Sequence, residues 1–98
     1  MTASIGVGQV TLYLEGATSL KDKRRVIKSL TTRMRNTFNV SVAEIADLDD
    51  MRVATIAIVC VSNSHAHAQE MLAKAIGFIE RNVEMGVIGE IDTEIIPY

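Results

Sequence analysis

Hydrophobic and polar positions alternate along the first part of the chain and then change to the spacing of a helix. Over residues 5–14 the alternation predicts a strand with one buried face. That face consists of Val10, Leu12 and Leu14. After Gly16, apolar residues recur at the three- and four-residue steps of an amphipathic helix. They are Leu20, Ile27, Leu30 and Met34. We predict that this helix begins after Ser19, a preferred N-cap residue, and ends near Asn36.

The two-residue period then returns. Residues 38–48 and 51–62 are predicted to form two strands, and the polar residues between them indicate a turn. The acidic residues of that turn are Asp47, Asp49 and Asp50. Because the two strands are so close in sequence, we expect them to pair as a hairpin.

The last third of the chain predicts a second helix and a final strand. Asn63 and Ser64 provide capping side chains, and Gly86 is expected to end the helix. Its buried side consists of Ala68, Met71, Leu72, Ala75, Ile76, Ile79 and Val83. Residues 87–98 alternate again and predict a strand. One face of that strand is acidic and consists of Glu90, Asp92 and Glu94.

The order of elements is therefore strand, helix, strand, strand, helix, strand. This is the ferredoxin-like βαββαβ pattern of the α+β class, with both helices on one face of a four-stranded antiparallel sheet. The pattern places the first and third strands centrally. The third is apolar on both faces, and the acidic last strand suits an edge, where charge discourages pairing with other sheets. A chain of 98 residues suits one such domain over residues 1–98.

Composition favours a folded domain in a reducing compartment. Hydrophobic residues make up 48% of the chain and proline occurs once, which argues against extended disorder. Cys60, the single cysteine, cannot form an internal disulfide, and its apolar neighbours favour a packed thiol over a reactive one. No apolar run is long enough to span a membrane and no secretory signal is visible, so we expect a cytoplasmic protein without membrane contact.

Charge is segregated along the chain. Seven of the ten basic residues lie between Ser19 and Asn36, where only Asp22 opposes them, so this segment carries +6 and the rest of a chain of net charge −2 carries −8. The seven are Lys21, Lys23, Arg24, Arg25, Lys28, Arg33 and Arg35. A concentrated basic surface gives information about what a protein binds rather than about how it folds.

Most of these cations share one side of the predicted helix. At about 100° per residue, five of them fall within a sector of about 100°, away from the apolar stripe. This basic stripe consists of Lys21, Arg24, Arg25, Lys28 and Arg35. Packing of the apolar side on the sheet directs the basic stripe to solvent, where it could follow a phosphate backbone or an acidic protein surface. An ordinary solvated helix face is the alternative, but such faces usually mix charges at i,i+4 spacing.

The open face of the predicted sheet is less suited to nucleic acid. Ferredoxin-like RNA binders stack bases on aromatic side chains of the two central strands. The chain has no aromatic motif of that kind in its third strand; its aromatic residues are Tyr13, Phe38, Phe78 and Tyr98. The acidic last strand would also repel phosphate if it faced the same way. RNA is therefore expected on the first helix.

No reaction centre is visible in the sequence. His65 and His67 point apart if they lie on a helix, and carboxylates two residues apart on a strand are too distant to chelate a metal ion alone. The aspartates of the turn are explained by turn chemistry. No nucleophile motif or phosphate-binding glycine loop is present. We therefore expect no enzyme activity, no metal and no cofactor.

Three blocks of sequence resemble the YlxP-like family, a bacterial domain of unknown function. They are SLKDKRRVIKSL at residues 19–30, FNVSVAE at residues 38–44 and VSN at residues 61–63. The resemblance implies a ferredoxin-like fold and a cytoplasmic protein that is often encoded beside translation initiation and ribosome maturation factors. The family often has Trp-Gln where this chain has Met51 and Arg52.

These observations lead to one main expectation and to alternatives. The main expectation is a binding protein of unestablished function that contacts RNA or the ribosome through the basic stripe, with Ser19 and the free amides of the helix start adding an anion site. The first alternative is a homodimer through the sheet face, or an ACT-like module with a ligand near Gly16. In the second, the basic helix of one protomer pairs with the acidic strand of another.

Overall fold

The computed structural model describes residues 2–98, which form four strands and two helices. The elements are β1 (Ser4–Tyr13), α1 (Leu20–Thr37), β2 (Ser41–Ala46), β3 (Val53–Ser62), α2 (His65–Asn82) and β4 (Val87–Pro97). The strands form one sheet in the order β2-β3-β1-β4, and every neighbouring pair is antiparallel. The predicted ferredoxin-like α+β fold is confirmed, with β1 and β3 in the centre and the acidic β4 at an edge.

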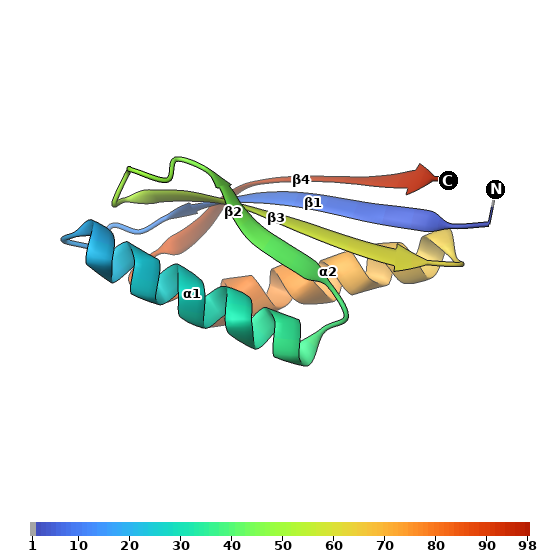
Figure 1. Ribbon diagram of the computed structural model, residues 1–98, viewed down its shortest axis with the longest axis horizontal. Helices are drawn as coiled ribbons and strands as arrows, with labels where there is room; N and C mark the ends of the chain where they lie inside the picture. The colour runs from blue at the N-terminus through green and yellow to red at the C-terminus, as the bar shows by residue number, and fades with distance from the viewer. Residues whose placement is uncertain (1) are drawn as a thin grey trace.

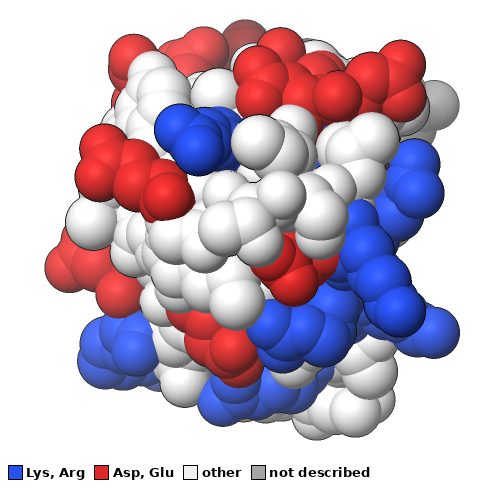
Figure 2. All heavy atoms as spheres, turned by 90° about the vertical axis from the view of Figure 1, so that its left-hand side faces the viewer, with Lys and Arg blue, Asp and Glu red and all other residues white. Residues whose placement is uncertain are grey.

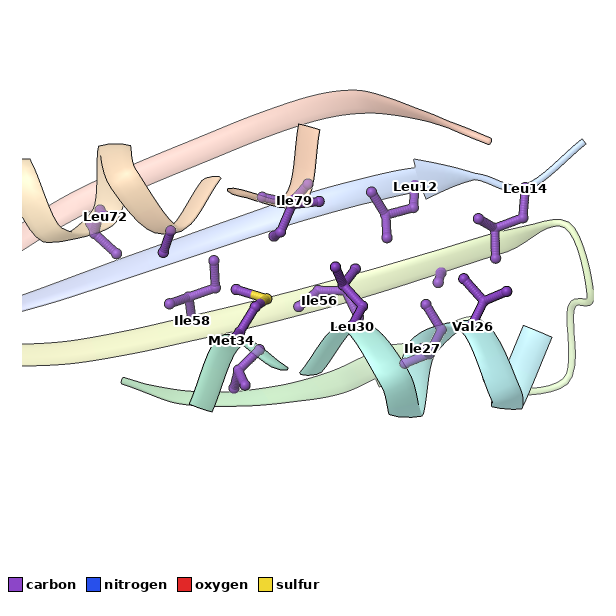
Figure 3. Close-up of a cluster of buried hydrophobic side chains, with 14 of the residues drawn as sticks. Leu12, Leu14, Val26, Ile27, Leu30, Met34, Ile56, Ile58, Leu72 and Ile79 are labelled. Carbon is purple, nitrogen blue, oxygen red and sulfur yellow. The ribbon is translucent and has the colours of Figure 1, made fainter. Parts of the chain in front are cut away.

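Both helices cover the same face of the sheet, and the other face is open (Figure 1). The core lies between the two layers, where side chains from α1 and α2 meet those of β1 and β3 (Figure 3). Val10, Leu12 and Leu14, predicted as the buried face of the first strand, have no exposed surface. Alternation therefore identified the buried side of β1. Of the predicted helical stripe, Ile27, Leu30 and Met34 are buried, whereas Leu20 is only partly buried.

The central strand β3 has two apolar faces, and the helices cover one of them. Ala54, Ile56, Ile58 and Cys60 form its buried face. On the opposite face, Val59 is 39% and Val61 is 62% exposed. The register places Val61 and Ile96 on either side of Ile5 of β1. One end of the open face is therefore an apolar row that crosses β3, β1 and β4.

The predicted boundaries of the second strand and of the second helix are wrong. The second strand was expected over residues 38–48, but β2 is shorter because the Phe38 N–H still bonds to the Met34 carbonyl at the end of α1, and Asp47 has a positive φ of 62°. The second helix ends at Asn82 rather than at Gly86. Gly86 instead lies against β1, where a Cβ atom would fall 2.1 Å from the Tyr13 carbonyl oxygen.

Candidate functional site

The basic stripe lies on the solvent side of α1. The helix buries Val26, Ile27, Leu30 and Met34 toward the sheet, and all five stripe residues are exposed. At about 100° per residue, the middle of the stripe falls about 140° from the middle of the buried side. Figure 2 shows most of the visible Lys and Arg along the lower and right-hand margin of one end of the molecule, with most Asp and Glu above and to the left and a few acidic residues between the basic ones.

Three cations of the stripe make no ion pair among the described residues, 2–98. They are Lys21, Arg24 and Lys28. Arg25 lies 3.6 Å from a carboxylate oxygen of Glu84, and both side chains are more than half exposed. Arg35 donates to the Val42 carbonyl oxygen over 3.2 Å. Exposed pairs of this kind contribute little to stability, so the stripe remains available to an anionic partner.

Ser19 acts as the N-cap of α1. Its hydroxyl oxygen accepts a hydrogen bond from the Asp22 N–H over 3.0 Å, and the Asp22 carboxylate accepts from the backbone N–H and hydroxyl of Thr18. The Thr18 N–H, with smaller help from the hydroxyls of Thr18 and Ser19 and from Arg25, lowers the pKa of the Asp22 carboxyl. A carboxylate of the chain therefore already occupies the positive end of the helix.

Arg33 belongs to the basic segment but not to the stripe. Its guanidinium lies 5.3 Å from the centre of the Phe78 ring and donates to the side-chain oxygen of Asn82 over 2.9 Å. Phe78 in turn meets Phe38 edge to face, with ring centres 5.6 Å apart. Arg33 therefore joins α1 to α2, and two of the four aromatic rings pack at this junction rather than on the open sheet.

Lys23 is one of the seven cations predicted to form a basic surface, but it does not lie on the surface. Its side chain is buried. Its Nζ lies 2.8 Å from Oε2 of Glu44 on β2, and it donates to the carbonyl oxygens of Asp47 and Asp50. Burial of Lys23 reduces the exposed charge of residues 19–36 to +5. A signal was available, since Lys23 precedes Ile27 by four residues and so continues the buried side of the helix.

The open sheet face is acidic along β4 and has little aromatic surface. The Tyr13 hydroxyl donates to both carboxylate oxygens of Glu90, at 2.8 and 2.7 Å. The hydrogen bond to this carboxylate raises the pKa of the Tyr13 phenol and lowers the pKa of Glu90. Asp92 lies opposite Gln9 and Glu94 lies opposite Val7 across the β1–β4 pair. A phosphate backbone on this face would meet carboxylates.

The remaining candidate residues lie in β3 and at the start of α2. His65 and His67 begin α2, and the His67 ring lies 2.9 Å from the Ser62 hydroxyl. Cys60 is buried, and this desolvation raises the pKa of its thiol. Within residues 2–98, no three His, Cys, Asp or Glu side chains come together as a metal site. Neither α1 nor α2 is long and apolar enough to cross a membrane.

The chain matches, over residues 5–91, the model of a family described as protein of unknown function (DUF503). It is 36% identical over 76 residues to the uncharacterized protein YlxP of Bacillus subtilis (strain 168), covering 78% of this chain and 83% of that protein. Two solved structures of designed proteins are similar at 10% identity. The match to Foldit4 has a TM-score of 0.51 and covers 96% of this chain and 98% of the Foldit4 chain. LFR1 1, with ferredoxin fold, has a TM-score of 0.53 and covers 97% and 86%. These two show the fold alone.

Proposed function

The chain belongs to the DUF503 family of proteins of unknown function, and we propose that it is a non-catalytic cytoplasmic protein that binds RNA through the basic stripe of α1. The resemblance to YlxP-like proteins at residues 19–30, 38–44 and 61–63 is confirmed by this membership. The gene neighbourhood that the resemblance implies favours ribosomal RNA among the possible anionic partners.

The observation that carries the proposal is the separation of the two sides of α1. The apolar side and Lys23 are buried, whereas Lys21, Arg24 and Lys28 are exposed without a carboxylate partner among the described residues. From Lys21 to Arg35 the stripe runs about 21 Å along the helix axis, enough to meet several successive phosphates. Contacts of this kind fix position along a backbone and carry little sequence information.

The helix start plays a smaller part in the proposal than the sequence suggested. The Ser19 hydroxyl and the Thr18 N–H are both engaged with Asp22. A phosphate at this end would have to approach the carboxylate of Asp22, which repels it. We therefore assign phosphate contact to the five cations of the stripe and assign capping to Ser19.

A charge-reversal experiment tests the proposal. The variant carries Lys21→Glu, Arg24→Glu and Lys28→Glu, and the matched control carries Arg52→Glu, Lys74→Glu and Arg81→Glu. All six positions are exposed, so both variants have the same net charge and both should fold. We expect the first to lose binding to ribosomal RNA and to purified small ribosomal subunits while the control retains it. Equal loss in both variants, or full binding by the first, contradicts the proposal.

The apolar row on the open face supports a second candidate, a homodimer that covers this face. Val61, Val59 and Ile96 are 62%, 39% and 37% exposed, and uncovered apolar area of this kind marks interfaces. We expect Val59→Lys/Val61→Lys to be monomeric by analytical ultracentrifugation and Leu48→Lys, a change at the exposed β2–β3 turn, to dimerise like the wild type. A wild-type monomer at high micromolar concentration contradicts this candidate.

Salt distinguishes that dimer from the other assembly that the sequence allows, in which the basic helix of one protomer meets the acidic strand of another. A dimer held by the apolar row should persist at about 1 M salt, where the Debye length is about 3 Å. An assembly held by the basic stripe should dissociate.

A further inference from the structure

The edge strand β4 and the neighbouring helix α2 form a groove. Its volume is about 550 Å³, and it lies beside the outer edge of β4. Leu72, Ile76 and Ile95 give it apolar walls. Ala73 and Gly77 lie one turn apart on α2, and the space stays open because Ala73 has only a methyl group and Gly77 has no side chain.

The outer edge of β4 is free to pair with another strand. β4 is the last strand of the sheet and is hydrogen-bonded to β1 alone among the described residues. Ile91 lies on the helix-covered side of β4, opposite the fully buried Val10, yet it is 48% exposed. An added strand would cover Ile91 and satisfy the free backbone groups of β4.

Charge restricts the sequence of such a strand. Glu94 and Glu80 lie at the groove, Asp92 lies on the neighbouring part of β4, and no Lys or Arg lines the groove in the described residues. Antiparallel pairing of two copies of β4 about Asp92 is disfavoured, because it would place Glu90 of one copy opposite Glu94 of the other. Basic side chains would complement this edge.

We propose that β4 and the β4–α2 groove bind an extended segment of a partner protein in which basic and apolar residues alternate. The segment pairs with the outer edge of β4 through its backbone. Its apolar side chains enter the groove beside Ala73 and Gly77, and its basic side chains lie on the open side near Asp92 and Glu94. This surface is separate from the basic stripe of α1, so the inference does not depend on RNA binding.

A labelled peptide of about ten residues with alternating Lys and Val tests the proposal, since it matches strand length and the charge of β4. We expect binding at about 0.15 M salt, with slowed hydrogen exchange of β4 amides. Asp92→Lys/Glu94→Lys should weaken binding at least about tenfold. The control Glu15→Lys/Asp49→Lys has the same net charge at exposed positions away from the groove and should bind as the wild type does.

Two further measurements separate strand pairing from charge attraction. The same peptide with every second backbone nitrogen methylated keeps its charge but cannot complete the ladder, and we expect it not to bind. Ala73→Leu fills the groove at an exposed helical position that tolerates leucine, and it should weaken binding about tenfold. No binding at about 1 mM peptide, equal binding of the methylated peptide, or equal loss in both charge variants would overturn the proposal.

Discussion

The Nζ atom of Lys23 lies 2.8 Å from Oε2 of Glu44, in an ion pair that joins α1 to β2. The Lys23 side chain is 1% exposed and the Glu44 side chain 15%. The contact is therefore a close ion pair between two side chains that are both largely removed from solvent. The two carbonyl oxygens of the β2–β3 turn complete the surroundings of the ammonium group. Lys23 therefore fixes the turn against the start of the helix that carries the basic stripe.

The buried ion pair predicts a large loss of stability on removal of one partner. Lys23→Met leaves the Glu44 carboxylate and the carbonyl oxygens of Asp47 and Asp50 without their donor, and we expect a cost of about 3 kcal/mol in the free energy of unfolding. Lys21→Met removes the same charge from an exposed position and should change stability by less than about 0.5 kcal/mol. Urea denaturation of both variants measures the difference. Equal stabilities would show that Lys23 contributes no more than a surface lysine.

Substitution by alanine is predicted to have opposite effects on stability at Gly86 and at Gly77. Gly86→Ala places a Cβ atom 2.1 Å from the Tyr13 carbonyl oxygen, so the backbone must shift and we expect a loss of about 3 kcal/mol. At Gly77, inside α2, a Cβ atom meets only the flexible end of Arg81, at 3.1 Å. Gly77→Ala should therefore raise stability by about 0.5–1 kcal/mol through helix propensity. Thermal denaturation of the two variants tests both changes in stability. A Gly86→Ala variant as stable as the wild type would contradict the close packing of Gly86, between α2 and β4, on β1.

The Tyr13–Glu90 hydrogen bond predicts a pH effect in the alkaline range. The bond raises the pKa of Tyr13 above its ordinary value of 10.0. The folded state therefore favours the neutral phenol. The hydrogen bond contributes fully to stability at a pH below the pKa of Tyr13 in the unfolded chain, and this contribution is lost as the pH rises through the pKa of Tyr13 in the folded protein. In a Tyr98→Phe background the ultraviolet titration reports Tyr13 alone, and Glu90→Gln should lower its midpoint. An unchanged midpoint would show that Glu90 does not raise the pKa of Tyr13.

The fold could be predicted from the chain because local patterns and tertiary packing agree. Val10, Leu12 and Leu14 alternate and are all buried, and Ser19 caps the helix whose start it predicted. The free face of β3 could not be predicted, since both of its faces are apolar. Its assignment depends on which side α1 and α2 cover, and that is a property of the whole chain.

The candidate site was predicted less completely. The five cations of the stripe are exposed as expected, but Lys23 is buried although it lies among them in sequence. Its position four residues before Ile27 was the available signal, but its acceptors belong to a turn 24 and 27 residues away and cannot be identified from local charge patterns. The β4–α2 groove was also missed, because it depends on the small size of Ala73 and Gly77 beside an edge strand.

RNA binding by the basic stripe is the central claim, and its salt dependence tests it most directly. We would measure the affinity for ribosomal RNA across a salt series for the wild type and for the Lys21→Glu/Arg24→Glu/Lys28→Glu variant. Each phosphate contact contributes about 0.7–0.9 to the slope of log affinity against log salt. We predict a wild-type slope of about −3 or steeper and loss of binding in the variant. A slope near zero, or a variant that binds with the slope of the wild type, would contradict the account.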